Sequence, residues 1–231
     1  MGNKLKIERR ADIVDLLINK AALKQDIADY SENILMQLKE VVQHELDEIA
    51  KSINDTRIRL DYKDNGKHEF RINIGSDTIV FQLHTNIFRL DDENPLWKTK
   101  YVEKNGANGY FGIINIYNFL AESVKQNRLN DVGYLIGRMF INHNEHFIME
   151  GEGQLGTDFQ DLENSKLTKD VMCQVIQSCL AFAVNFDLVT PPYKMVQEVS
   201  LQQINAISSD LQMATGKRLG FKFSSEEKDF Y

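Results

Sequence analysis

The chain has 231 residues, of which 42% are hydrophobic and 10% aromatic, and it contains three prolines. These values are typical of a globular protein and exclude a disordered chain or one divided by proline-rich linkers. The net charge of −7 argues against general nucleic-acid binding, because neutralising phosphates requires clustered Lys and Arg.

No apolar run approaches the roughly 18 residues that span a bilayer, and the N-terminus lacks the apolar stretch of a secretion signal. We therefore expect a cytoplasmic protein without membrane contact. The two cysteines fit a reducing compartment. Cys173 and Cys179 fall on different faces of a predicted helix, so they cannot pair with each other and are expected to be free thiols.

Residues 1–54 are predicted to form an N-terminal helical segment. Its apolar residues advance by about 3.75 positions per step, nearer the 3.6-residue period of a globular helix than the 3.5-residue period of a coiled coil. These residues are Leu23, Ile27, Tyr30, Ile34, Leu38, Val42, Leu46, Ile49 and Ile53. The sequence leaves two arrangements open: the helix packs on the body of its own chain, or it dimerises with a second copy.

Alternation of apolar and polar residues then predicts strands over 57–62, 68–74 and 78–84, with a fourth near 86–90. Asn65-Gly66 lies between the first two and is a strong hairpin signal. Consecutive strands on short turns form an antiparallel meander. One face of this sheet is apolar and the other polar, so we expect helices to cover the apolar face.

The remaining predicted elements are mostly helices. They are a short strand at 98–102, helices at 113–124 and 130–140, a strand at 146–150, a helix that Thr168 caps and that runs to 186, and a last helix from Ser200 to Gly216. This order predicts an α+β fold, in which an antiparallel meander of three to five strands carries helices on one face and follows the long N-terminal helical segment. Residues 55–231 are expected to form one globular domain.

A candidate metal site lies in the stretch HNEHFIME. His143 and His146 would share a face of a helix, whereas His146 and Glu150 would share a face of a strand. Imidazole and carboxylate groups are common ligands of zinc and other divalent metals. The spacing differs from the H-E-x-x-H of zinc proteases, so a metal-dependent hydrolase or nuclease that uses His143, His146 and Glu150 is the alternative hypothesis.

Gly151, Gly153 and Gly156 match G-x-G-x-x-G, a pattern found in loops that hold nucleotide phosphates. Glu150 and Glu152 flank the first glycine and would repel a phosphate. No βαβ unit surrounds the motif. We therefore interpret these glycines as a flexible surface loop that needs positive φ, and we expect no cofactor unless a divalent metal binds nearby.

Polar residues within the apolar pattern of 111–142 suggest a ligand pocket between the sheet and the helices predicted there. Its candidate lining is Asn115, Tyr117, Asn118, Tyr134 and Arg138.

No catalytic signature stands out in the sequence, and no catalytic residue can be assigned. The first hypothesis is therefore a non-enzymatic cytoplasmic module that senses a ligand or binds a protein. Its partner would be another protein or a second copy of itself, and we expect a homo-oligomer.

Overall fold

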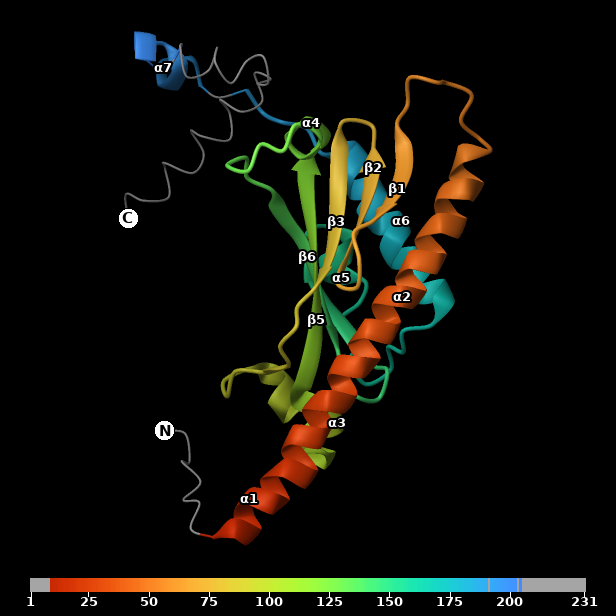
Figure 1. Ribbon diagram of the computed structural model, residues 1–231, viewed down its shortest axis with the longest axis vertical. Helices are drawn as coiled ribbons and strands as arrows, with labels where there is room; N and C mark the ends of the chain where they lie inside the picture. The colour runs from red at the N-terminus through yellow and green to blue at the C-terminus, as the bar shows by residue number, and fades with distance from the viewer. Residues whose placement is uncertain (1–8, 191, 203, 205–231) are drawn as a thin grey trace.

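The computed structural model describes residues 9–190, 192–202 and 204, and it confirms an α+β fold with a long N-terminal helical segment (Figure 1). The described strands number seven, two more than the upper bound of the prediction. They are β1 (Leu60–Asp64), β2 (Glu69–Ile74), β3 (Asp77–Leu83), β4 (Phe88–Arg89), β5 (Tyr110–Leu120), β6 (Tyr134–Ile141) and β7 (Phe147–Gly151).

The strands form one antiparallel meander, as predicted. Their order is β1-β2-β3-β5-β6-β7, so each strand on this path pairs with the next one along it, and β4 adds a short pairing to β5. The pairing of β5 with β6 is irregular, because its register shifts between Ile116 and Tyr117. Such a bulge changes which residues face each side of a sheet.

The N-terminal segment is helical from Arg10 to Ala50. It consists of α1 (Arg10–Leu16), a π-helical turn (η1, Leu17–Ala21) and α2 (Ala22–Ala50). α2 buries one stripe of residues, which comprises Ile27, Ser31, Ile34, Leu35, Leu38, Val42 and Leu46. α1 and η1 bury none, and this end of the helix extends past the end of the sheet (Figure 1).

α2 lies close to β5 at Gly112. A Cβ atom at this glycine would lie 2.0 Å from Oγ and 2.8 Å from Cβ of Ser31. The Ser31 hydroxyl is buried and donates to the carbonyl of Ile27 at 2.7 Å. Two small residues therefore allow the helix backbone to lie directly on the strand.

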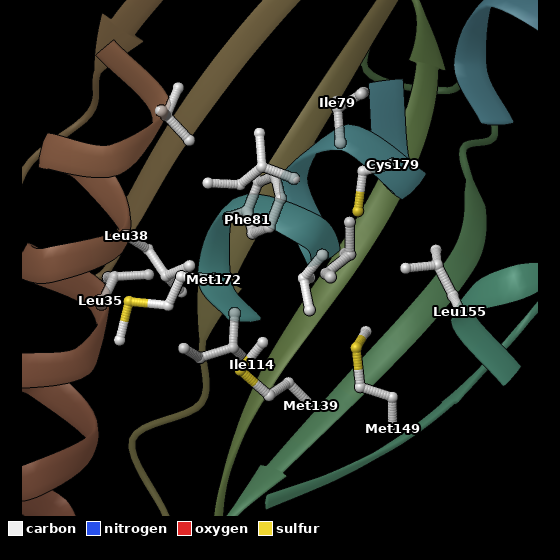
Figure 2. Packing of buried hydrophobic residues seen from close by; sticks show 14 of the residues in the cluster. Leu35, Leu38, Ile79, Phe81, Ile114, Met139, Met149, Leu155, Met172 and Cys179 are labelled. Carbon is white, nitrogen blue, oxygen red and sulfur yellow. The ribbon is translucent and has the colours of Figure 1, made fainter. Parts of the chain in front are cut away.

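The main core lies between the sheet and the pair α2 and α6 (Lys169–Asn185). Thr168 caps α6, as predicted, by accepting a hydrogen bond from the Val171 N–H. Figure 2 shows Leu35 and Leu38 of α2 and Met172 of α6 beside the inward-facing residues of the sheet. This layer explains why β1 and β2 alternate in sequence, since one of their faces is covered and the other is polar.

A second, smaller apolar cluster covers one end of the opposite face of the sheet. Its buried members are Val102, Phe111, Ile113, Phe140, Ile148 and Leu162. They come from the sheet and from two connecting segments, one of which contains η2 (Pro95–Lys98), α3 (Lys100–Lys104) and η3 (Gly106–Gly109). The other connection pairs with the outer edge of β7, where the N–H of Met149 donates to the carbonyl of Phe159 at 2.9 Å.

The predicted helices at 113–124 and 130–140 are wrong: these residues form β5 and β6, and only α4 (Ala121–Lys125) is helical. Part of each strand is buried on both faces, so its apolar residues run almost continuously and lose the period of two. The strand expected at 98–102 is also wrong, because residues 100–104 form α3. Lysine and glutamate are good helix formers and favour that short helix.

The glycine segment is more compact than a flexible surface loop. Only Gly153 of the three has positive φ, at 55°. A Cβ atom on Gly156 would lie 2.1 Å from the carbonyl oxygen of Gly151, so these two glycines permit a close backbone contact. α5 (Gln154–Thr157) lies within the motif and places Leu155 in the core (Figure 2).

Among the described residues, no helix is long and apolar enough to span a membrane. α7 (Tyr193–Val196) follows α6. Most of the last predicted helix, including Gly216, falls outside the residues that the structure describes.

Candidate ligand-binding cavity

The face of the sheet opposite α2 and α6 is only partly covered, and we call it the open face. The second apolar cluster covers one end of this face. Between the two ends of the open face, a row of polar residues crosses five strands in register. This row is Glu69, Gln82, Asn115, Arg138 and Glu150.

A cavity of about 330 Å³ lies on the open face, beside the segment that follows β5. Its lining residues are Glu69, Arg71, Val80, Gln82, Tyr117, Phe119, Ser123, Val124, Asn127, Arg128, Leu129 and Asp131. Val80, Tyr117 and Phe119 come from β3 and β5 and form an apolar floor. The cavity therefore combines aromatic and aliphatic surface with charged groups.

Residues 121–131, which we call the α4 segment, bring the chain back over this floor. α4 ends near Asn127, whose φ of 51° is uncommon for a residue with a side chain. The turn is closed by the N–H of Arg128, which donates to the carbonyl of Ser123 at 2.9 Å. Farther on, a Cβ atom at Gly133 would lie 2.4 Å from the ring of Phe119, so that glycine allows the ring to pack against the backbone.

Arg128 is the most unusual residue of the cavity lining. Its side chain is only 4% exposed, and its Nε lies 3.5 Å from Oδ2 of Asp131. That carboxylate oxygen also accepts a hydrogen bond from the Ser123 hydroxyl at 2.6 Å. None of the three guanidinium nitrogens of Arg128 has a hydrogen-bond acceptor among the described residues. Buried donors without acceptors are costly, and native proteins contain few of them.

The second arginine of the lining is satisfied within the sheet. Arg71 Nε donates to Oε1 of Glu69 at 2.7 Å, and the Asn65 amide donates to the same oxygen at 2.6 Å. Arg71 and Arg128 together balance Glu69 and Asp131, so the formal charge of the lining is zero.

The structure separates the five predicted pocket residues. Tyr117 lines the cavity, whereas Asn115 and Arg138 lie on the open face outside it. Asn118 faces the helices, where its amide donates to Oδ1 of Asp77 at 3.2 Å. Tyr134 also lies on that side, because it pairs with Asn118 and its ring centroid is 5.2 Å from that of Phe186 at the end of α6. The helices expected to enclose the pocket are strands, so the five residues do not enclose one space.

The three residues of the candidate metal site each contact a different partner. His143 Nε2 lies 3.0 Å from Oδ1 of Asn108, and His146 Nδ1 lies 2.8 Å from the Leu162 carbonyl. Glu150 forms an ion pair with Arg138. Within the part of the chain that the structure describes, no three His, Cys, Asp or Glu side chains are grouped so as to hold a metal ion.

His143 nevertheless has a perturbed titration. Partial burial lowers the pKa of its imidazole below the ordinary value, and nearby Asp26 partly opposes this shift. The ring of His146 stacks on that of Tyr101, with 5.1 Å between the centroids. Both histidines thus belong to the packing at one end of the sheet, and the metal hypothesis stays a prediction.

Sequence reasoning missed Arg128 and Ser123 as members of a site. Ser123 falls within the helix predicted at 113–124 and Asp131 within the one predicted at 130–140, and Arg128 lies in the polar stretch between them, which has no period. Nothing local distinguishes a buried arginine in such a stretch from a solvated one. Its burial depends on how the α4 segment folds back over the sheet.

Comparison with known protein families, with curated proteins and with solved structures gives no match to this chain.

Proposed function

We propose that the chain is a non-enzymatic module that binds a small molecule in the cavity between the open face and the α4 segment. The observation that carries this proposal is the cavity of about 330 Å³ with its mixed apolar and charged lining. Binding sites for small molecules are typically concave, at least about 300 Å³ in volume, and mostly apolar with a few polar groups that orient the ligand.

Binding is favoured over catalysis because the acidic groups of the lining already have partners. Glu69 is held by Arg71 and Asn65, and Asp131 by Ser123 and Arg128. A general base or nucleophile must instead be able to reach its substrate. We further propose a cytoplasmic location, which fits the two free cysteines, Cys173 and Cys179.

Native mass spectrometry of untagged protein, purified without chelator, tests this function. We expect retained mass from a small molecule. Val80→Phe on the cavity floor should abolish its retention, because a larger ring would occupy the space. The matched control is Lys63→Phe, since Lys63 is exposed and lies on the same face, one strand beyond Arg71 and outside the cavity. Equal retention by both variants would contradict binding in this cavity.

Self-association through the N-terminal helix is a second candidate function. Ile13, Val14, Leu17 and Ile18 are between 46% and 64% exposed on a helix end that extends past the sheet. Pairing with the equivalent residues of a second copy would bury these side chains in the self-complementary interface of a twofold dimer.

Light scattering during size-exclusion chromatography tests this second candidate. We expect Leu17→Glu combined with Ile18→Glu to reduce the mass to that of one chain, because two buried charges would oppose pairing. The control is Met36→Glu, which alters an exposed apolar residue on another part of the helix. A monomeric wild-type protein would rule out this candidate.

A further inference from the structure

We infer that the ligand of the cavity carries an oxyanion, a carboxylate or a phosphate group, which the guanidinium of Arg128 binds. This inference rests on the proposed function and specifies the chemistry of its ligand.

The first support is the unmet hydrogen-bonding capacity of Arg128. A guanidinium has five N–H donors and does not lose its charge. In Arg128 all three nitrogens are buried, and none finds an acceptor among the described residues. The single ion-pair contact, 3.5 Å from Nε to Asp131, leaves the Nη1 and Nη2 edge without an acceptor. That edge can bind a carboxylate or a phosphate in a bidentate manner.

The second support is that Arg128 is held in place while its donors remain available. Ser123 fixes the Asp131 carboxylate, and Asp131 lies beside the Nε side of the guanidinium. The backbone N–H of Arg128 is fixed by the Ser123 carbonyl. An arginine positioned in this way loses little side-chain entropy when an anion binds.

The rest of the lining indicates what accompanies the oxyanion. Val80, Tyr117 and Phe119 offer an apolar surface beside the charged end of the cavity. The lining is neutral overall, so a bare anion gains little from long-range attraction. A ligand with an aromatic or aliphatic body and one oxyanion matches both parts of the cavity.

Access requires a small displacement of the α4 segment, because all three guanidinium nitrogens are buried. This segment is short and projects Leu129, which is 83% exposed, beside the cavity. Removal of the guanidinium from water strengthens its bonds to a bound anion. Ligand binding should therefore also protect the α4 segment from hydrogen exchange.

Isothermal titration with four probes tests the inference: benzoate, phenyl phosphate, inorganic phosphate and the neutral analogue benzamide. We expect benzoate or phenyl phosphate to bind at least about ten-fold more tightly than benzamide, since charge-assisted hydrogen bonds are about twice as strong as neutral ones. Tighter binding of benzoate supports a carboxylate ligand. Tighter binding of phenyl phosphate, with competition by inorganic phosphate, supports a phosphate ligand.

Variants of Arg128 test whether its side chain causes the preference for oxyanions over benzamide. Arg128→Lys keeps the charge but lacks the planar fork, and we expect it to weaken oxyanion binding about ten-fold or more. Because removal of one partner of a buried ion pair can impair folding, the second variant is Arg128→Met with Asp131→Asn, which removes both charges together. It should fold and lose the preference for oxyanions. Arg57→Gln, an exposed arginine outside the cavity, is the control.

The outcomes separate this inference from the proposed function. If benzamide binds as tightly as the anions, and the Arg128 variants change nothing, the oxyanion is refuted while the cavity still binds ligands. If no probe binds but mass spectrometry finds a retained molecule that Val80→Phe displaces, the oxyanion is again refuted and the function stands. If no probe binds and mass spectrometry finds no retained molecule, both the oxyanion and the proposed function are refuted.

Discussion

The contact between Gly112 and Ser31 gives a sharp test of how α2 lies on the sheet. In Gly112→Ala, the new Cβ would lie 2.0 Å from Oγ and 2.8 Å from Cβ of Ser31. Both distances are below contact distance, and the helix backbone cannot move away without disturbing its buried stripe. Overpacking of this kind costs about 1–3 kcal/mol. With a slope of about 2 kcal/mol per molar urea, the unfolding midpoint should fall by about 0.5–1.5 M.

A second substitution shows whether the clash with Ser31 causes the loss of stability in Gly112→Ala. Ser31→Gly removes both clashing atoms at a helix-propensity cost of about 0.5 kcal/mol relative to serine. Gly112→Ala should therefore cost much less in the Ser31→Gly background, with a coupling energy of about 0.5–3 kcal/mol. Gly106→Ala is the control, because a Cβ atom there meets nothing within 4 Å.

Urea unfolding followed by circular dichroism measures the wild type and the four variants. A Gly112→Ala midpoint equal to that of Gly106→Ala, or the absence of rescue, would refute the described contact. The same assay reports dimerisation. A dimer, formed either by exchange of α2 or by pairing of the N-terminal helix ends, makes the midpoint depend on protein concentration, whereas a monomer with α2 packed on its own chain does not.

Four further outcomes are expected. Thr168→Ala should lower the free energy of unfolding by about 0.5–1 kcal/mol, and Thr168→Ser by much less, because α6 loses its cap. Cys173 should react slowly with iodoacetamide at pH 8, since burial and a hydrogen bond to Glu45 raise its pKa to about 11, and buried Cys179 should react only after unfolding. The pKa of His143 is lowered in the folded state, so the unfolded chain takes up the proton first as pH falls. Stability should therefore decrease as pH falls below about 6.5, and urea titrations at two pH values should show a smaller decrease for His143→Gln. If the metal hypothesis is correct, His143→Ala with His146→Ala should abolish bound metal in native mass spectrometry, and full retention would refute it.

The parts of the fold that could be predicted are the helices and strands with one buried face and one face exposed to solvent. β2 alternates because α2 and α6 cover one side and the other side is polar. The stripe of α2 repeats at helical spacing for the same reason. In β5, Phe111 and Ile113 pack on the second cluster while Ile114 and Ile116 pack on the main core, so the period of two disappears. Local sequence cannot show that two separate layers cover one strand.

The bulge between β5 and β6 explains why the pocket residues could not be grouped from sequence. Ile116 pairs with Gly137, but the next residue of β5, Tyr117, pairs with Leu135. β6 thus has one extra residue, Ile136, which is buried in the main core. Beyond this point each position of β6 changes face, as expected for a bulge. Tyr134 consequently lies on the helix side, although its even spacing from Arg138 would place both on the open face.

The bulge between β5 and β6 lies beside the cavity. Bulges increase local twist and are frequent beside functional sites, where they change the direction of side chains. Here the bulge begins at Tyr117, the first residue of β5 that lines the cavity, and the α4 segment follows at the end of that strand. Before the bulge, the second cluster fills the space above the open face with apolar side chains. After it, Tyr117 and Phe119 instead form a floor beneath a polar segment that contains a buried arginine. If this change of twist makes the cavity, deletion of Ile136 should restore a regular pairing, in which Leu135 and Tyr134 keep their partners Tyr117 and Asn118, and eliminate binding of the oxyanion probes. A folded Ile136 deletion that binds them as well as the wild type would show that the cavity does not depend on the bulge.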